Sequence, residues 1–178
     1  MVYLLFQLIA LALPPETALQ PQPGGTHETV EERAAREVSI AVDAAEAVRL
    51  EGRLPGRDTQ GSAVDLLGLV FHESGFRYDV DSGRCRKGDC DAGYALCLAQ
   101  IHPANAEERV EVTETRLGCF RVAIRRMRGS IRTCGVGEGE LSMFCGGQCD
   151  DSRAVAASRA HLETIRAWRA RAAKLQAR

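Results

Sequence analysis

The sequence predicts a mostly α-helical domain with a small β or loop insert after its most apolar helix. Apolar side chains recur every three or four residues in several long segments, which is typical of helices that bury one face. Residues 76–95 break this pattern, because they are rich in Gly, Asp and Cys. The chain has 178 residues, enough for one domain with a sizeable core, which we place at residues 28–178.

Residues 1–19 are expected to be a signal peptide or another N-terminal hydrophobic segment. The apolar run over residues 2–13 is shorter than the roughly 20 residues of a membrane-spanning helix. Its length suits the apolar region of a secretory signal, although no basic residue precedes it. Four of the six prolines fall in residues 14–26, which indicates a linker, and residues 20–27 are assigned to it.

Two helices are expected before the insert. The first covers residues 28–51, where Val38 belongs to an apolar face with helical spacing and Gly52 would end the helix. The second begins at Ser62, because Ser62 and Asp65 have the spacing of a capping box. Apolar residues cover most sides of this second helix, so it should be central and buried.

Further elements are expected after the insert. The segment over residues 94–101 is short and apolar, and it could form either a helical turn or a buried strand. Helices are expected over residues 114–133, 138–145 and 152–176. Trp168 shares the apolar spacing of the last helix, so we expect it in the core rather than as a platform for a sugar.

The formal net charge of −1 and the pI of about 6.4 argue against a nucleic-acid-binding protein. The charge is nevertheless uneven. Residues 28–51 carry seven acids and three bases, whereas residues 151–178 carry seven bases and two acids. A solvated helix face accounts for the basic tail, and the alternative is contact with an acidic surface such as an anionic cell-wall polymer.

Seven cysteines are many for this length, and together with an export signal they favour disulfides. An odd number leaves one thiol free, and the sequence does not determine the pairing. Zinc is the alternative, held by Cys85 and Cys90 with Cys145 and Cys149. Neither pair has the two-residue spacing of most structural zinc sites, so no metal or cofactor is expected.

Glu73 lies at the end of the apolar helix, two residues before Gly75. Its neighbours at three, four and seven residues towards the N-terminus are all apolar, namely Val70, Leu69 and Leu66. Apolar surroundings favour the protonated form of a carboxyl group, and a protonated carboxyl can donate a proton to a leaving group. A solvated glutamate in the last helical turn is the alternative interpretation.

The segments ESGF at residues 73–76 and GYALCLAQI at residues 93–101, in this order and spacing, resemble the goose-type lysozyme and lytic transglycosylase (SLT domain) superfamily. The resemblance implies a lysozyme-like α+β domain. It implies that Glu73 is the catalytic acid/base and that Ser74 supports it by hydrogen bonding. Tyr94, Gln100 and Ile101 would contact the sugar.

The resemblance also implies a reaction. Such enzymes cut the β-1,4 bond between N-acetylmuramic acid and N-acetylglucosamine in peptidoglycan strands. Glu73 would protonate the glycosidic oxygen and then deprotonate the muramyl C6 hydroxyl, which closes an anhydro ring. If an aspartate of the insert, such as Asp79, Asp81, Asp89 or Asp91, positioned water instead, the enzyme would be a hydrolytic lysozyme. A monomer in the periplasm or outside the cell is expected, with a cell-envelope assembly as a further partner.

One stretch departs from the family. Many members have an Ala-Tyr-Asn-x-Gly motif whose tyrosine contacts the catalytic acid. The matching stretch here is SMFCGG at residues 142–147, in which Phe144 replaces the tyrosine and Cys145 replaces the asparagine. Phe144 would line the substrate site but cannot donate a hydrogen bond. We expect a Cys145–Cys149 disulfide here. An inactive or divergent module that binds peptidoglycan is the alternative function.

Other candidate sites are weaker. His72 and His102 are expected to line a cleft or lie in the core rather than bind a metal. His161 is expected at the surface. A nucleophilic Cys97 paired with a histidine is disfavoured, because no local cysteine motif supports it. Residues 79–91 begin like a calcium loop, but Cys90 stands where the loop requires a glutamate.

Overall fold

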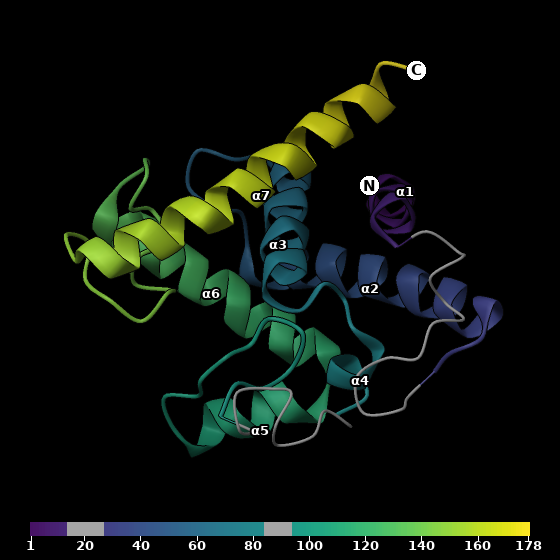
Figure 1. Cartoon of the computed structure of the whole chain (residues 1–178), viewed down its shortest axis with the longest axis horizontal. Coiled ribbons are helices and arrows are strands. Elements are labelled where there is room, and N and C mark those ends of the chain that lie inside the picture. The colour runs from purple at the N-terminus through teal and green to yellow at the C-terminus, as the bar shows by residue number, and fades with distance from the viewer. Residues whose placement is uncertain (14–26, 84–93) are drawn as a thin grey trace.

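A computed structural model describes residues 1–13, 27–83 and 94–178 (Figure 1). The prediction of a mostly helical chain is confirmed. The described ranges contain no β-strand, and their β structure is limited to one isolated bridge between Leu96 and Ile101. Most of the linker and of the Cys-rich loop, with Cys85 and Cys90, lies outside the described residues. The helices are α1 (Val2–Ala12), α2 (Val30–Glu51), α3 (Thr59–Ser74), α4 (Tyr78–Asp81), α5 (Ala106–Glu114), α6 (Arg116–Cys134) and α7 (Ser152–Gln176).

Helix α3 is central and buried, as predicted, but it begins earlier than expected. Asp58 is its N-cap and accepts a hydrogen bond from the Gly61 amide. The expected capping box was wrong because Ser62 and Asp65 are both buried inside the helix. The Ser62 hydroxyl donates to the Asp58 carbonyl, and Asp65 forms ion pairs with Arg57 and Arg169.

The C-terminal end of α3 is fixed by its cap and by α2. Gly75 adopts the left-handed conformation, with φ of 58°, and its amide donates to the Phe71 carbonyl. Arg36 of α2 donates to the Phe76 carbonyl over 2.8 Å. The end of α3, which carries Glu73, is therefore held in a defined position.

Helix α2 buries the C-terminal half of the expected apolar face, including Ala41 and Val48, but not its N-terminal half. Val38 is exposed, whereas Arg33 and Glu37 are buried. Arg33 pairs with the buried Glu28. Burial raises the pKa of Glu37, although the nearby Arg33 and Arg36 oppose the shift. Apolar spacing does not predict the N-terminal half of the buried face because the charged residues Arg33 and Glu37 occupy it.

Helices α3 and α7 cross in close contact at Gly68. A Cβ atom added to Gly68 would lie 3.0 Å from the Ile165 Cα atom and 3.2 Å from its Cγ1 atom. Glycine thus allows the two backbones to approach, and this crossing brings the end of α3 beneath α7 (Figure 1).

Replacing Gly68 with alanine should therefore push α3 and α7 apart. We expect the free energy of unfolding to fall by about 1–3 kcal/mol, measured by chemical denaturation. Gly129→Ala in α6 is the matched control, because a Cβ atom there meets nothing within 4 Å. It should raise stability by about 0.5–1 kcal/mol through helix propensity. Equal effects of the two substitutions would contradict the role of Gly68.

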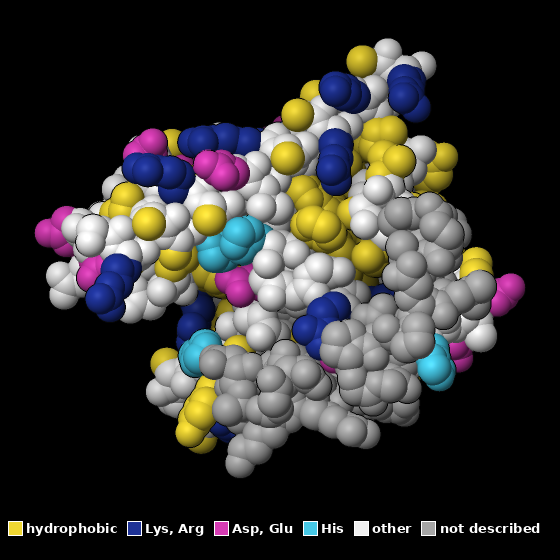
Figure 2. Space-filling model, in the orientation of Figure 1, with side chains coloured by type: hydrophobic (Ala, Val, Ile, Leu, Met, Phe, Trp, Pro, Cys, Tyr) yellow, Lys and Arg dark blue, Asp and Glu magenta, His cyan; other side chains and the backbone are white. Residues whose placement is uncertain are grey.

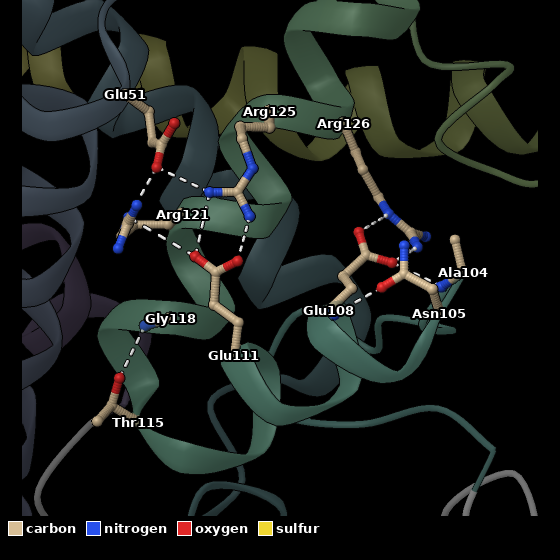
Figure 3. A network of polar contacts seen from close by, with 10 residues as sticks. All are labelled: Glu51, Ala104, Asn105, Glu108, Glu111, Thr115, Gly118, Arg121, Arg125 and Arg126. Carbon is tan, nitrogen blue, oxygen red and sulfur yellow. Dashed lines mark hydrogen bonds and ion pairs between the residues drawn. The ribbon is translucent and has the colours of Figure 1, made fainter.

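Helix α5 was not expected from the sequence, because Val112 is its one buried residue among nine. Asn105 caps it, and ion pairs hold it to α6 (Figure 3). Arg126 pairs with Glu108 over 2.6 Å, and Arg125 pairs with Glu111 and with Glu51 of α2. These arginines lie off the apolar stripe of α6, as the sequence indicates.

The expected helix over residues 138–145 was wrong. The segment forms a series of turns, and the flanking Gly137 and Gly146 have φ of 150° and 84°. The Cys134–Cys149 disulfide ties these turns to the end of α6, and Cys97–Cys119 ties the 94–101 segment to the start of α6. The expected Cys145–Cys149 pairing was therefore wrong, and so was a zinc site with both thiolates.

Helix α1 packs against α2 and α7 (Figure 1). Leu5, Leu8 and Ile9 are fully buried in the same core as Trp168, which was correctly predicted to be a core residue. Among the described helices, none is long and apolar enough to cross a membrane.

Candidate functional site

A cavity of about 700 Å³ lies at the C-terminal end of α3. Its walls come from four parts of the chain: the end of α3, the 95–102 segment, α7 and the turns over residues 143–146, with one side chain from α6. The lining residues are Glu73, Ala95, Gln100, Ile101, His102, Arg126, Met143, Phe144, Cys145, Gly146, Ala157 and His161.

Four of the six predicted site residues line this cavity: Glu73, Gln100, Ile101 and Phe144. The side-chain amide of Gln100 donates to the Cys97 carbonyl over 2.9 Å, which holds the turn that the Cys97–Cys119 disulfide also fixes. The cavity wall is thus a braced turn rather than part of a sheet.

The other two predicted residues lie elsewhere. The hydroxyl of the buried Ser74 donates to the Val70 carbonyl, one turn back in α3, and not to Glu73. Tyr94 is 68% exposed and is not among the lining residues.

His161 is the principal site residue that the sequence analysis missed. The expected surface position was wrong, since His161 is buried and its Nε2 atom lies 2.6 Å from Glu73 Oε1. The spacing of the last helix predicts this buried position of His161. His161 precedes Ile165 by four residues and Trp168 by seven, so all three share one buried face of α7.

The contacts of His161 indicate a doubly protonated ring. Its Nε2 faces the Glu73 carboxylate, and its Nδ1 lies 2.8 Å from the Ala157 carbonyl. A ring that carries hydrogen on both nitrogens donates to both of these oxygen atoms at once. Burial alone would lower the pKa of His161. Hydrogen bonds to Cys145, Glu73 and the Ala157 carbonyl outweigh it and raise the pKa to about 10.

A second histidine, His72, lies beside this ion pair. The ring centroids of His72 and His161 are 4.0 Å apart, and His72 Nδ1 contacts the Thr164 hydroxyl. Burial and the positive charge on His161 lower the pKa of His72, and Glu73 only partly offsets them. At neutral pH the site therefore contains one charged and one neutral imidazole. Figure 2 shows histidine and acidic side chains together beneath α7.

Two residues of the turns complete the surroundings of His161. Phe144 meets its ring edge-to-face, with centroids 6.1 Å apart. The Cys145 sulfur lies 3.8 Å from His161 Nδ1, and Cys145 is half-buried and forms no disulfide. His102, expected in a cleft or the core, lines the same cavity, and its carbonyl accepts a hydrogen bond from Arg126.

Alkylation of Cys145 should block this cavity. The thiol lines the same space as Glu73, so a bulky maleimide on its sulfur would occupy the volume a substrate needs. We expect labelling of the wild-type protein to reduce at least tenfold any activity that depends on this cavity, measured with the same assay before and after treatment. Cys145→Ser provides the control, because it should keep activity and become insensitive to the reagent. Full activity of the labelled wild-type protein would contradict this location.

Comparisons of the chain with protein-family models, with curated proteins and with solved structures gave no match.

Proposed function

We propose that the protein is an exported peptidoglycan-cleaving enzyme of the lytic transglycosylase type, with a lysozyme-like domain. Its substrate is the β-1,4 bond between N-acetylmuramic acid and N-acetylglucosamine. The observation that carries this proposal is the gathering of Glu73, Gln100, Ile101 and Phe144 around one cavity. These residues lie up to 71 positions apart in the chain. Glu73, Gln100 and Ile101 belong to the segments that resemble the family, and Phe144 stands where the sequence departs from it.

The acidic groups favour a transglycosylase over a two-carboxylate hydrolase. Glu73 is the one carboxylate among the described lining residues, and two of the candidate second acids, Asp89 and Asp91, lie outside the described residues. Asp79 pairs with Arg77, and Asp81 pairs with Arg116, both away from the cavity lining. Two-carboxylate glycosidases place both acids across the scissile bond. A single acid suits the intramolecular reaction, in which the muramyl C6 hydroxyl replaces water.

In the proposed reaction, Glu73 and His161 share one proton. Transfer of the Nε2 proton to Oε1, over 2.6 Å, turns the ion pair into a carboxylic acid and a neutral imidazole. Glu73 then protonates the glycosidic oxygen as the C1–O bond breaks. Its carboxylate accepts the proton of the C6 hydroxyl as that oxygen bonds to C1, and the pair regains its proton. His161 takes over the contact that a tyrosine makes in the family, which Phe144 cannot make.

The second candidate function is a module that binds peptidoglycan without cutting it. The Glu73–His161 ion pair favours this alternative, because a carboxylate beside an imidazolium is a poor proton donor at rest. Both functions need the same cavity and the same glycan partner, and they differ in whether a bond is cleaved.

Export is part of the proposal, since two disulfides brace the described ranges and disulfides persist in oxidising compartments. We expect a monomer that needs no cofactor and works in the periplasm or outside the cell, alone or within a cell-envelope assembly.

Mass spectrometry of products from purified sacculi tests the proposal. Release of 1,6-anhydromuramyl ends supports a transglycosylase. Reducing ends would instead indicate a hydrolytic lysozyme. Binding to sacculi without release of either product would support the binding module and contradict the enzymatic proposal.

A further inference from the structure

Helix α1 has apolar residues on its exposed side as well as on its buried side. It carries no charged residue. Leu5 and Leu8 are fully buried against the rest of the domain, yet Tyr3 is 72% exposed and Leu11 is 60% exposed. A surface helix on a water-soluble domain normally turns charged side chains outwards. The outer face of α1 is therefore suited to contact with an apolar environment.

A groove of about 360 Å³ lies between α1 and the last turns of α7. Figure 2 shows Lys and Arg side chains next to hydrophobic ones over this part of the molecule. The groove, called the α1–α7 groove below, is lined by Gln7, Leu11, Arg171, Lys174, Leu175 and Arg178.

The three basic residues of the groove have no carboxylate within ion-pair distance among the described residues, and all three are exposed. By contrast, Arg169 on the same helix pairs with Asp65. Unpaired cations around an apolar floor attract molecules that carry an anionic head and an apolar body.

We propose that the α1–α7 groove is a membrane-docking surface that binds the interface of an anionic phospholipid bilayer. Helix α1 has 11 residues and is about 17 Å long, so it can lie in the plane of the interface but cannot span the bilayer. Its exposed side, with Leu11 and the amphipathic ring of Tyr3, enters the boundary between headgroups and acyl chains. Arg171, Lys174 and Arg178 contact the lipid phosphates.

An anionic polymer is the competing ligand for these cations. A polyphosphate or teichoic-type chain would use Arg171, Lys174 and Arg178 but gain nothing from Tyr3 and Leu11. The apolar floor of the groove favours lipid, because it offers buried area to acyl chains.

Vesicle sedimentation tests the proposal. The full-length protein is mixed with phosphatidylglycerol-containing vesicles or with pure phosphatidylcholine vesicles at low salt. We expect partitioning into the anionic vesicles only. Neutralising a basic residue near the surface should weaken binding about fivefold, so the triple variant R171Q/K174Q/R178Q should lose on the order of a hundredfold. The matched control R109Q/R132Q/R153Q removes three exposed arginines elsewhere and should bind like the wild type.

The variant Y3S/L11S tests the apolar part and should weaken vesicle binding at least tenfold. Circular dichroism of each variant confirms that it is folded. Equal binding to both vesicle types would overturn the proposal. So would full binding by Y3S/L11S together with displacement by soluble polyphosphate, which would identify a polymer site. Vesicle binding is independent of activity on sacculi, so the two proposals can fail separately.

Discussion

Glu73→Gln should abolish glycan cleavage while leaving the domain folded. Glutamine preserves the shape of the side chain and can still accept the hydrogen bond from His161, but it has no acidic proton. General acid–base catalysis contributes about 10²–10⁴-fold, so the rate of release of muropeptides should fall by about that factor or more. The free energy of unfolding should fall at neutral pH, because the buried His161 loses the carboxylate that helps to raise its pKa, and circular dichroism should confirm that the domain is still folded.

Glu163→Gln serves as the matched control. Glu163 is an exposed acid on α7, two residues from His161, and it is not among the residues that line the cavity. The control should digest sacculi at the wild-type rate. If Glu73→Gln also did so, Glu73 would not be the catalytic acid.

His161→Gln should have the second-largest effect, on both activity and the pH dependence of stability. The amide keeps a donor near Glu73 but carries no charge and shuttles no proton. We expect at least a tenfold loss of cleavage and a changed pH–rate profile. His72→Gln is the control, since the lowered pKa of His72 keeps it neutral at pH 7, and it should alter the profile little.

The stability effect has a defined sign. The pKa of His161 is raised from 6.5 to about 10 in the folded protein. Its charged form therefore stabilises the fold fully below about pH 6.5, and this contribution is lost as the pH rises towards 10. The loss is at most about 5 kcal/mol. The groups that face the ring are Glu73 and His72 on α3, Cys145 on the turns and the Ala157 carbonyl on α7 itself.

Denaturation at several pH values between 6 and 10 measures this contribution. The wild type should lose stability across the window, and His161→Gln should lose much less. Cys145→Ser separates the thiol from the imidazole. Because the hydrogen bond to Cys145 is the largest cause of the raised pKa of His161, this variant should lose part of the wild-type slope, whereas His161→Gln should lose nearly all of it. A His161→Gln curve parallel to the wild type would rule out His161 as the titrating group.

Apolar spacing predicted the helices that bury a continuous stripe. The last helix has the expected bounds, and α3 is central as expected, because burying apolar area drives both. Helix α5 was missed because ion pairs such as Arg126–Glu108, rather than apolar contacts, hold it in place. Residues 138–145 form turns rather than the expected helix because the flanking Gly137 and Gly146 adopt positive φ angles.

The candidate site was predictable in part for a similar reason. Glu73 and Gln100 sit in short segments whose order in the chain can be read directly. His161 is 88 residues from Glu73, so their contact depends on how closely α7 crosses α3 at Gly68. The disulfide pairing could not be predicted from the sequence either. The choice between Cys134 and Cys145 as the partner of Cys149 depends on the path of a glycine-rich turn.

The burial of α1 sets up a competition in time. Leu5, Leu8 and Ile9 lie in the core of the folded domain. If the protein is exported as we propose, the same apolar run is the segment that an export apparatus would bind. Residues 2–12 cannot pack in the core and bind an export apparatus at the same time. Folding would therefore bury the signal that export requires. The order of events therefore decides the outcome: a chain that folds first keeps α1 as structure, and a chain captured first exposes it to transport.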